Sequence, residues 1–339
     1  MKKIQFLLLL TLFGQALMTN EVNIYTSRHY DSDDALYEEF RKETGIKVNI
    51  ISGKGSALLE RIKSEEKNPP ADIFFTVDAG NLWKVQKENL FQEIKSKKVI
   101  STVPRNLRGP NNEWTAIAKR ARVIFYNPKN VSSEEIKDLT YEDLAKEEWK
   151  NRVVIRSSSN MYNQSLVASL IANHGIKQTE SWAKKLVNNL ARKPQGNDRS
   201  QIIAVSNGEA DIAVANSYYI GIMLSGSAGK EQLEAAKKVK MHFPNQTDRG
   251  VHVNISGAGI LKNAPNPDNA NRFLEFLLSK RVQKYMVDLS FEYPIVEGVL
   301  PSPEIASFGL NFKEDDTAVK RFGELNPDAI RLMDRSGWK

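Results

Sequence analysis

The 339-residue sequence contains no cysteine and only four histidines. Disulfide bonds, thiolate metal sites and cysteine nucleophiles are therefore excluded, and a histidine-rich zinc site is not expected. Beyond the N-terminus there is no apolar run of the roughly 20 residues that a membrane-spanning helix needs. The net charge is +7, but the basic residues are spread among acidic ones and do not gather with aromatic residues. Nucleic acid is therefore not an expected partner.

The first residues have the pattern of an export signal. Lys2 and Lys3 precede the apolar run IQFLLLLTLF, and small residues follow at Gly14 and Ala16. The run is shorter than the roughly 20 residues that cross a bilayer. This pattern predicts a signal peptide over residues 1–16 that is cleaved on export, with a retained anchor or an internal strand as the alternatives.

Strand patterns alternate with helix patterns over most of the chain, which predicts an α/β fold with largely parallel sheets. The expected strands of two successive sets lie at 22–27, 47–52, 71–78, 152–156 and 211–217. The expected helices lie at 31–45, 56–68, 79–90, 163–175, 181–193 and 199–210. Near the C-terminus, residues 266–288 form a strongly amphipathic pattern that predicts one further helix.

Two long extended stretches, 115–128 and 239–261, flank the second set of elements. We interpret them as two hinge strands between two lobes, since a chain of this length usually exceeds one compact core. The predicted architecture is that of a two-lobed periplasmic binding protein, each lobe a mixed, mostly parallel sheet flanked by helices. Lobe 1 is expected to comprise 20–118 and 244–339, the latter with the C-terminal helices, and lobe 2 residues 119–243. Such a connection allows the lobes to close on a ligand.

Four of the ten tyrosines share one position relative to the predicted strands. Tyr30, Tyr162 and the pair Tyr218–Tyr219 each come directly after a strand and before a helix. Because ligands bind at the carboxyl ends of strands in open α/β sheets, we expect these tyrosines to face one cleft between the lobes. A single tyrosine in such a place is more simply explained by packing, so the shared position is what indicates a site.

Several phenols in one cleft suit a hard and highly charged cation. An unperturbed tyrosine has a pKa of about 10 and is neutral at physiological pH, so a strong Lewis acid must displace its proton. Fe(III) is such an ion, and its hardness matches the anionic oxygen of a phenolate. Ca²⁺ or Mg²⁺ would instead call for clustered carboxylates. The acidic run at 31–34 is better explained by the dipole of the helix that it begins.

Charge balance and position add three further candidates. Four phenolates around one Fe³⁺ leave a charge of −1, and a buried charge is costly unless it is balanced. Arg120 and Arg122 lie on one face of the first hinge strand, and we expect one of them, preferably Arg122, behind the tyrosines. An exposed arginine pair is the alternative. His29, next to Tyr30, is expected as a fifth, nitrogen ligand, or alternatively as a hydrogen-bond donor to the ligands.

Five segments together resemble the periplasmic ferric-iron-binding proteins of ABC importers, the bacterial transferrins, and among them the cyanobacterial type. They are IYTSRHYDSDDALYEEFRKETGIKV, ADIFFTVDAGNLW, KRARVIFYN, RSSSNMYNQS and ANSYYIG. The resemblance implies that Fe(III) is bound in an interlobe cleft by Tyr30, Tyr162, Tyr218 and Tyr219, with His29 beside them. It also implies a monomeric periplasmic protein, not an enzyme, that delivers iron to an inner-membrane ABC permease and its ATPase. With five protein ligands, an exogenous anion is dispensable.

Other small solutes are the alternatives within the same architecture. A polyamine, thiamine or oxyanion site would favour tryptophan with carboxylates, or helix N-termini with serine and glycine, over converging tyrosines. A metal-dependent hydrolase or oxidase is the alternative from another class. It is disfavoured because no general base and no open coordination position can be identified.

Overall fold

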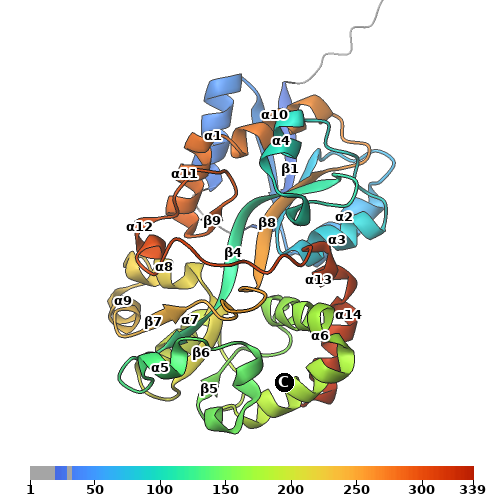
Figure 1. The fold of residues 1–339 in the computed structure, drawn as a ribbon. Coiled ribbons are helices and arrows are strands. Elements are labelled where there is room, and N and C mark those ends of the chain that lie inside the picture. The colour runs from blue at the N-terminus through green and yellow to red at the C-terminus, as the bar shows by residue number, and fades with distance from the viewer. Residues whose placement is uncertain (1–19, 29–32) are drawn as a thin grey trace, which may run out of the picture.

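Two long strands join two lobes in this computed structural model, which describes residues 20–28 and 33–339. Strands β4 (Trp114–Tyr126) and β8 (Val253–Ile260) run side by side through the middle of the molecule, as Figure 1 shows. The two-lobed α/β architecture predicted from the sequence is therefore confirmed. The predicted signal peptide over residues 1–16 lies outside the described residues, as do His29 and Tyr30.

Lobe 1 is built on a sheet in which β2 (Lys47–Ser52), β1 (Glu21–Thr26) and β3 (Ile73–Val77) run parallel. Strand β8 joins β3 in the antiparallel sense. All five residues of β3 are buried, as expected for a strand that is covered on both faces. The helices of this lobe are α1 (Asp33–Thr44), α2 (Gly55–Ser64), α3 (Ala79–Lys87), α4 (Lys97–Thr102), α10 (Pro267–Leu277) and α11 (Lys280–Ser290), with a 3₁₀ turn at Arg105–Leu107.

Lobe 2 begins where β4 changes its partner. Up to Ala121 this strand pairs with β8, and from Arg122 it pairs with β6 (Ile212–Asn216). Strand β5 (Val153–Val154) lies parallel to β6, while β7 (Lys240–His242) pairs with the far end of β4. The helices of this lobe are α5 (Ser133–Ile136), α6 (Met161–Asn188), α7 (Asp198–Ser206), α8 (Tyr218–Leu224) and α9 (Lys230–Ala236), with 3₁₀ turns at Glu142–Ala145 and Glu147–Trp149.

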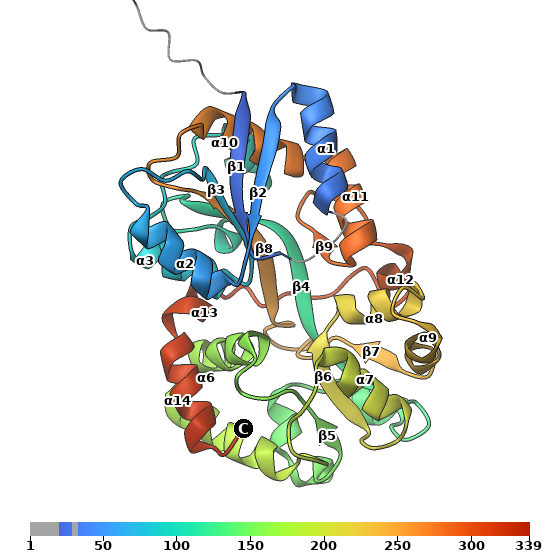
Figure 2. The same cartoon turned by 180° about the vertical axis from the view of Figure 1, so that it is seen from behind.

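The C-terminal part of the chain crosses between the lobes once more. After β9 (Tyr293–Pro294) and α12 (Pro303–Ala306), an extended segment leads to α13 (Lys320–Glu324) and α14 (Asn326–Arg335). Helix α13 contacts both α3 of lobe 1 and α6 of lobe 2, whereas α14 packs along α6, as both Figure 1 and Figure 2 show. The domain boundaries at 118/119 and 243/244 stay a prediction.

Two expected elements are wrong in their extent. The single helix over 266–288 is two helices, because Leu278 leaves the helical region and the Ser279 side chain caps α11 by accepting a hydrogen bond from Val282 N. The extended stretch 239–261 is two strands, β7 and β8, separated by a turn in which Asn245 has a φ of 61°. The Ser279 cap thus divides the predicted helix, and the turn with the left-handed Asn245 divides the predicted strand. The hydrophobic pattern of the sequence continues through both breaks and does not reveal them.

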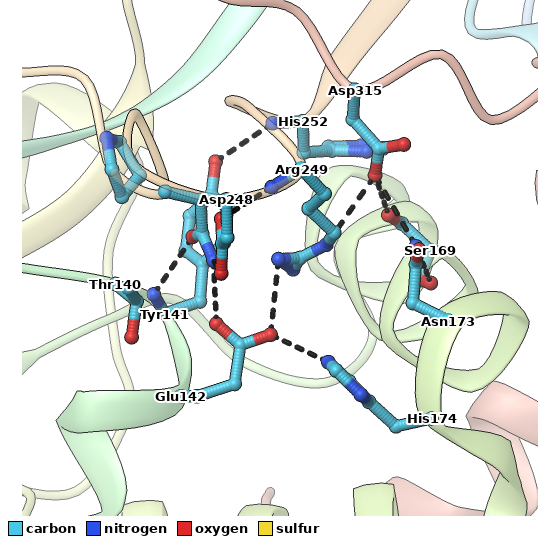
Figure 3. A network of polar contacts seen from close by, with 12 residues as sticks. Thr140, Tyr141, Glu142, Ser169, Asn173, His174, Asp248, Arg249, His252 and Asp315 are labelled. Atoms are coloured by element: carbon cyan, nitrogen blue, oxygen red, sulfur yellow. Dashed lines mark hydrogen bonds and ion pairs between the residues drawn. The ribbon is translucent and has the colours of Figure 1, made fainter.

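A partly buried polar network ties the turn before β8 to α6 and to the C-terminal segment (Figure 3). Arg249 forms ion pairs with Glu142 (Nη1–Oε1, 3.0 Å) and Asp315 (Nε–Oδ2, 3.5 Å). Glu142 also accepts from His174 of α6, and Asp315 accepts from Ser169 of the same helix at 3.0 Å. The network therefore fixes the end of the hinge strand to lobe 2.

None of the helices within residues 20–28 and 33–339 combines the length and the apolar character needed to cross a membrane.

Candidate functional site

Two of the predicted ligand tyrosines meet because their strands are parallel neighbours. Tyr162 is the second residue of α6, which follows β5, and Tyr218 is the first residue of α8, which follows β6. Since β5 and β6 run in the same direction, their carboxyl ends lie at one edge of the sheet. The Tyr218 hydroxyl donates a hydrogen bond of 3.3 Å to the hydroxyl of Tyr162. Residues 56 positions apart in the sequence thus place two buried phenols in contact.

Tyr219 lies on the same side as its neighbour Tyr218. The two ring centroids are 4.2 Å apart, and the ring planes are inclined by 31°. In a strand, adjacent side chains would point to opposite faces, but here both residues belong to the first turn of a helix. Burial, with the nearby Tyr162 and Asp198 as lesser causes, raises the pKa of Tyr219 well above its usual value. The phenol is therefore protonated at physiological pH unless a cation displaces the proton.

The position of Tyr162 is set by the start of α6. Asn160 is the N-cap residue, and its side chain accepts hydrogen bonds from the backbone N–H groups of Tyr162 (3.2 Å) and Asn163 (3.3 Å). The preceding serines do not cap this helix; the hydroxyls of Ser157 and Ser159 are bonded to one another at 3.0 Å. Asparagine and serine are equally good N-caps, so composition alone could not distinguish them.

Arg122 is buried next to the tyrosines, and its charge is shared with a carboxylate. Its Nη1 donates to Asp198 Oδ1, and its Nη2 donates to the side chain of Asn163 at 2.6 Å. Arg156, at the end of β5, donates to the other oxygen of Asp198 at 2.6 Å, and its Cζ atom lies 5.8 Å from the ring centroid of Tyr162. One buried aspartate therefore holds two arginines beneath the tyrosines.

Arg120 is also buried, so the alternative of an exposed arginine pair is excluded. The Cζ atom of Arg120 lies 5.3 Å from the ring centroid of Tyr162, within cation–π range. Its guanidinium donates to Glu292 Oε1 at 3.2 Å and to the carbonyl of Ile255 at 3.0 Å. Of the two predicted arginines, Arg120 therefore lies against the ring of Tyr162, whereas Arg122 is bonded to Asp198 and to Asn163, the residue after Tyr162.

The remaining predicted ligands, His29 and Tyr30, lie outside the described residues. On either side of them, Arg28 and Asp33 form a buried bidentate ion pair with N–O distances of 2.8 and 3.1 Å. Arg28 also stacks over the ring of Phe75, with its Cζ atom 4.6 Å from the centroid. Within the described part of the chain, no group of three or more histidine, cysteine, aspartate and glutamate side chains is arranged to hold a metal.

The structure also reveals charged residues that the sequence did not indicate. Arg156 shares the strand-end position of the tyrosines, which was a usable signal. Asp198 is the first residue of α7, where an acidic residue is explained by the helix dipole alone. Glu292 lies more than 70 residues beyond the last predicted ligand, and no sequence pattern links it to the site. These residues are found only through the tertiary contacts.

Residues 68–317 match the family of bacterial extracellular solute-binding proteins. Over 319 residues the chain is 49% identical to iron uptake protein A1 of Synechocystis sp., covering 94% of this chain and 88% of that protein. It is 26% identical to the major ferric iron-binding protein of Neisseria meningitidis serogroup B, with 94% of this chain and 93% of that protein covered. Relatives with these names are binding and uptake proteins.

The fold has a counterpart among solved structures. The structure of Trichodesmium FutA (IdiA) in complex with iron and citrate ligands superposes with a TM-score of 0.90. The two chains are 53% identical, and the match covers 94% of this chain and 100% of the other. The resemblance inferred from the five sequence segments is confirmed.

Proposed function

The chain belongs to the bacterial extracellular solute-binding proteins, and on that basis we propose that it captures Fe(III) through tyrosinate ligands between its two lobes. The proposed ligands are Tyr162, Tyr218 and Tyr219 of lobe 2 together with Tyr30 and His29 of lobe 1. Iron is here the transported substrate, and no chemical conversion of it is required of the protein.

The observation that carries this proposal is the meeting of Tyr162 with Tyr218. Three phenols lie within one buried cluster at the carboxyl ends of two parallel strands, where open α/β sheets bind ligands. No such clustering of phenols is needed for a polyamine, thiamine or an oxyanion. Phenolate oxygens instead match the hardness and the charge of Fe(III).

The charged residues around the cluster support an anionic metal complex. Four phenolates on Fe³⁺ carry a net charge of −1, which a buried site must balance. Among the described residues, four arginines form ion pairs with three carboxylates near the tyrosines. The arginines are Arg28, Arg120, Arg122 and Arg156, and the carboxylates are Asp33, Asp198 and Glu292. Positive groups so close to the phenols favour an anionic metal complex.

Capture and release follow from this chemistry. Iron must displace the phenol protons, so binding releases protons and weakens as the pH falls. Closure of the lobes about β4 and β8 brings the lobe 1 ligands onto tyrosines that lobe 2 already holds together. Reduction to Fe(II) or opening of the lobes then lowers the affinity. We propose a periplasmic monomer, exported by a cleaved signal peptide, that delivers iron to an ABC permease and its ATPase.

A titration with Fe(III), supplied as ferric nitrilotriacetate, tests the proposal. The purified protein is expected to develop a visible phenolate-to-iron charge-transfer band with a stoichiometry of one. The variants Tyr218→Phe and Tyr219→Phe remove one ligand each without changing the ring volume. Each is expected to weaken Fe(III) binding at least tenfold, because one metal–ligand bond is lost. A tenfold change in affinity corresponds to about 1.4 kcal/mol of binding free energy. The band is also expected to shift or fade.

Tyr126→Phe is the matched control. Tyr126 is partly buried at the end of β4 and pairs with Ile212, the first residue of β6, whereas Tyr218 follows the opposite end of β6. Removal of its hydroxyl is expected to leave the band and the affinity unchanged. A colourless wild-type protein in the presence of Fe(III), or Tyr218→Phe and Tyr219→Phe variants that bind like the wild type, would refute the proposal.

A further inference from the structure

Glu292 is a fully buried carboxylate that connects residues from distant parts of the chain. It lies between α11 and β9 and has an exposed fraction of 0%. Its Oε1 accepts hydrogen bonds from Arg120 at 3.2 Å and from the hydroxyl of Ser256 at 2.7 Å. Its Oε2 accepts from Arg28 at 3.4 Å. Glu292 thus bridges the end of β1 to both hinge strands, β4 and β8.

The residue before it, Phe291, contacts lobe 2. Phe291 has a φ of 60°, a left-handed conformation that is uncommon for a residue other than glycine, asparagine or aspartate. Its ring packs directly on the backbone of α8, because a Cβ atom placed on Gly221 would lie only 2.5 Å from the ring. Backbone strain of this kind persists where the surrounding contacts stabilise it. Here these are the contacts of two adjacent side chains, Phe291 with α8 and Glu292 with the arginines.

These contacts reach all three segments that carry the proposed ligands. Arg28 directly precedes His29 and Tyr30 in the chain. Arg120 lies against the ring of Tyr162, and Gly221 is in the same helix as Tyr218 and Tyr219. We infer that the Phe291–Glu292 dipeptide is a positioning element of the iron site, which holds Arg120 against Tyr162 and fixes α8, the helix of Tyr218 and Tyr219.

The physical basis is the geometry of the guanidinium groups. Glu292 fixes Arg120 by its charge, and Arg120 in turn packs against one face of Tyr162. Without the carboxylate, Arg28 keeps its ion pair with Asp33, whereas Arg120 loses the charged contact with Glu292 that helps to hold it against the ring. Tyr162 then gains rotational freedom, and the site loses the preorganised geometry on which tight binding depends. Glu292 acts through the arginines and is not itself a ligand.

The variant Glu292→Gln tests this inference, which rests on the proposed function. Glutamine keeps the shape and one carbonyl acceptor but removes the charge. Titration with ferric nitrilotriacetate is expected to show at least a tenfold loss of Fe(III) affinity and a shifted charge-transfer band. The double variant Glu292→Gln/Arg120→Gln is expected to lose little more affinity than either single variant, because residues that act through each other give non-additive effects.

Asp72→Asn is the matched control for the loss of a buried carboxylate. Asp72 is also fully buried in lobe 1 and accepts hydrogen bonds from the backbone of Asn23 at 2.7 Å and from the Asn266 N–H at 2.5 Å. It contacts no ligand-bearing segment through these bonds. The control is expected to lower the thermal midpoint while leaving the iron spectrum unchanged.

Phe291→Leu provides a second variant if Glu292→Gln does not fold. It removes the ring that packs on α8 and is expected to shift the charge-transfer band, whereas leucine retains an apolar contact. A wild-type protein that shows no band overturns the proposed function itself. A wild-type protein that binds iron, with Glu292→Gln or Phe291→Leu variants of identical affinity and spectrum, overturns only the positioning role.

Discussion

At the scale of single residues, the hinge strands are held in place by side chains that form hydrogen bonds with the backbone of β4 and of the residues before β8. The Tyr141 hydroxyl donates to the carbonyl of Arg122 on β4 and accepts from the N–H of His252, at 3.2 Å, just before β8. His252 Nε2 lies 3.2 Å from Ser165 Oγ of α6, while its Nδ1 has no partner among the described residues. His252 therefore lies buried and uncharged at the junction of the hinge with lobe 2.

His252 is expected to make the protein less stable in mild acid. Burial, opposed by Asp315 and assisted by Arg122 and Arg249, lowers the pKa of His252 from 6.5 to about 3. Between these values the unfolded chain binds the proton and the folded chain does not, so this stability is complete above pH 6.5 and declines as the pH falls towards 3. The expected loss between pH 7 and pH 5 is about 2 kcal/mol from this residue.

Urea unfolding of the wild type and of His252→Gln at pH 7 and pH 5 measures this effect. Other carboxylates and histidines titrate in both proteins, so the difference between them isolates His252. The variant is expected to lose less stability on acidification. Equal losses in both proteins would contradict the assignment.

At the scale of secondary-structure elements, the short helix α8 decides the geometry of the site. It has seven residues and no side-chain cap, so its own hydrogen bonds contribute little stability. It is held by packing: Tyr218 and Ile220 face the core, and α12 and Phe291 contact it from outside. The orientation of Tyr218 and Tyr219 therefore depends on what packs against this helix.

Gly221→Ala is expected to disturb α8 by overpacking. The added methyl group would lie 2.5 Å from the ring of Phe291, which is closer than two non-bonded carbon atoms can approach. Overpacking of this kind costs about 1–3 kcal/mol, and the shift of α8 is expected to weaken Fe(III) binding as well. Differential scanning calorimetry and iron titration measure the two effects.

Gly53→Ala is the control for a glycine substitution. A methyl group there would lie 3.4 Å from the flexible Leu58 side chain, an ordinary contact. This substitution is expected to change the free energy of unfolding by no more than about 0.5 kcal/mol and to leave iron binding unchanged. If Gly221→Ala behaves like this control, α8 is not constrained by Phe291.

At the scale of the whole molecule, three connections cross between the lobes, and polar contacts accompany them. Asn254 of β8 donates to Asp78, the N-cap residue of α3, at 2.9 Å and to Ser165 of α6 at 2.6 Å. One hinge side chain therefore contacts a helix of each lobe. Such contacts, together with α13 between α3 and α6, connect the two lobes beside the hinge strands, about which we expect the lobes to rotate.

Binding of Fe(III) is expected to compact the molecule. A chain of this length has a radius of gyration near 20 Å, and closure is expected to reduce it by on the order of 1 Å. Small-angle X-ray scattering with and without ferric nitrilotriacetate measures the change. The double variant Tyr218→Phe/Tyr219→Phe is expected to show no compaction. An unchanged radius of gyration for the iron-loaded wild type would contradict closure.

Much of the architecture was predictable, because it depends on local patterns. The first hinge strand was expected at 115–128 and is found at Trp114–Tyr126, and Gly175 interrupts α6 with a φ of 77°, where a helix end was predicted. The break between α10 and α11 escaped prediction, since the apolar periodicity continues through it and only the Ser279 cap marks it. Periodicity shows which face is buried but is less sensitive to where a helix stops.

The clustering of Tyr162 with Tyr218 and Tyr219 could be predicted from the sequence by itself, because strand ends are local features and parallel strands bring their ends to one edge of a sheet. Charge balance and the shared face of the first hinge strand brought Arg120 and Arg122 into consideration, but did not indicate their separate partners. Only the tertiary structure decided that Asp198 joins Arg122 to Arg156, and that Glu292 joins Arg28 to Arg120. An ion pair between residues as far apart in the sequence as Arg28 and Glu292 produces no periodic pattern from which it could be predicted. They form because burial requires each charge to find a partner, and the fold alone determines which partner is near.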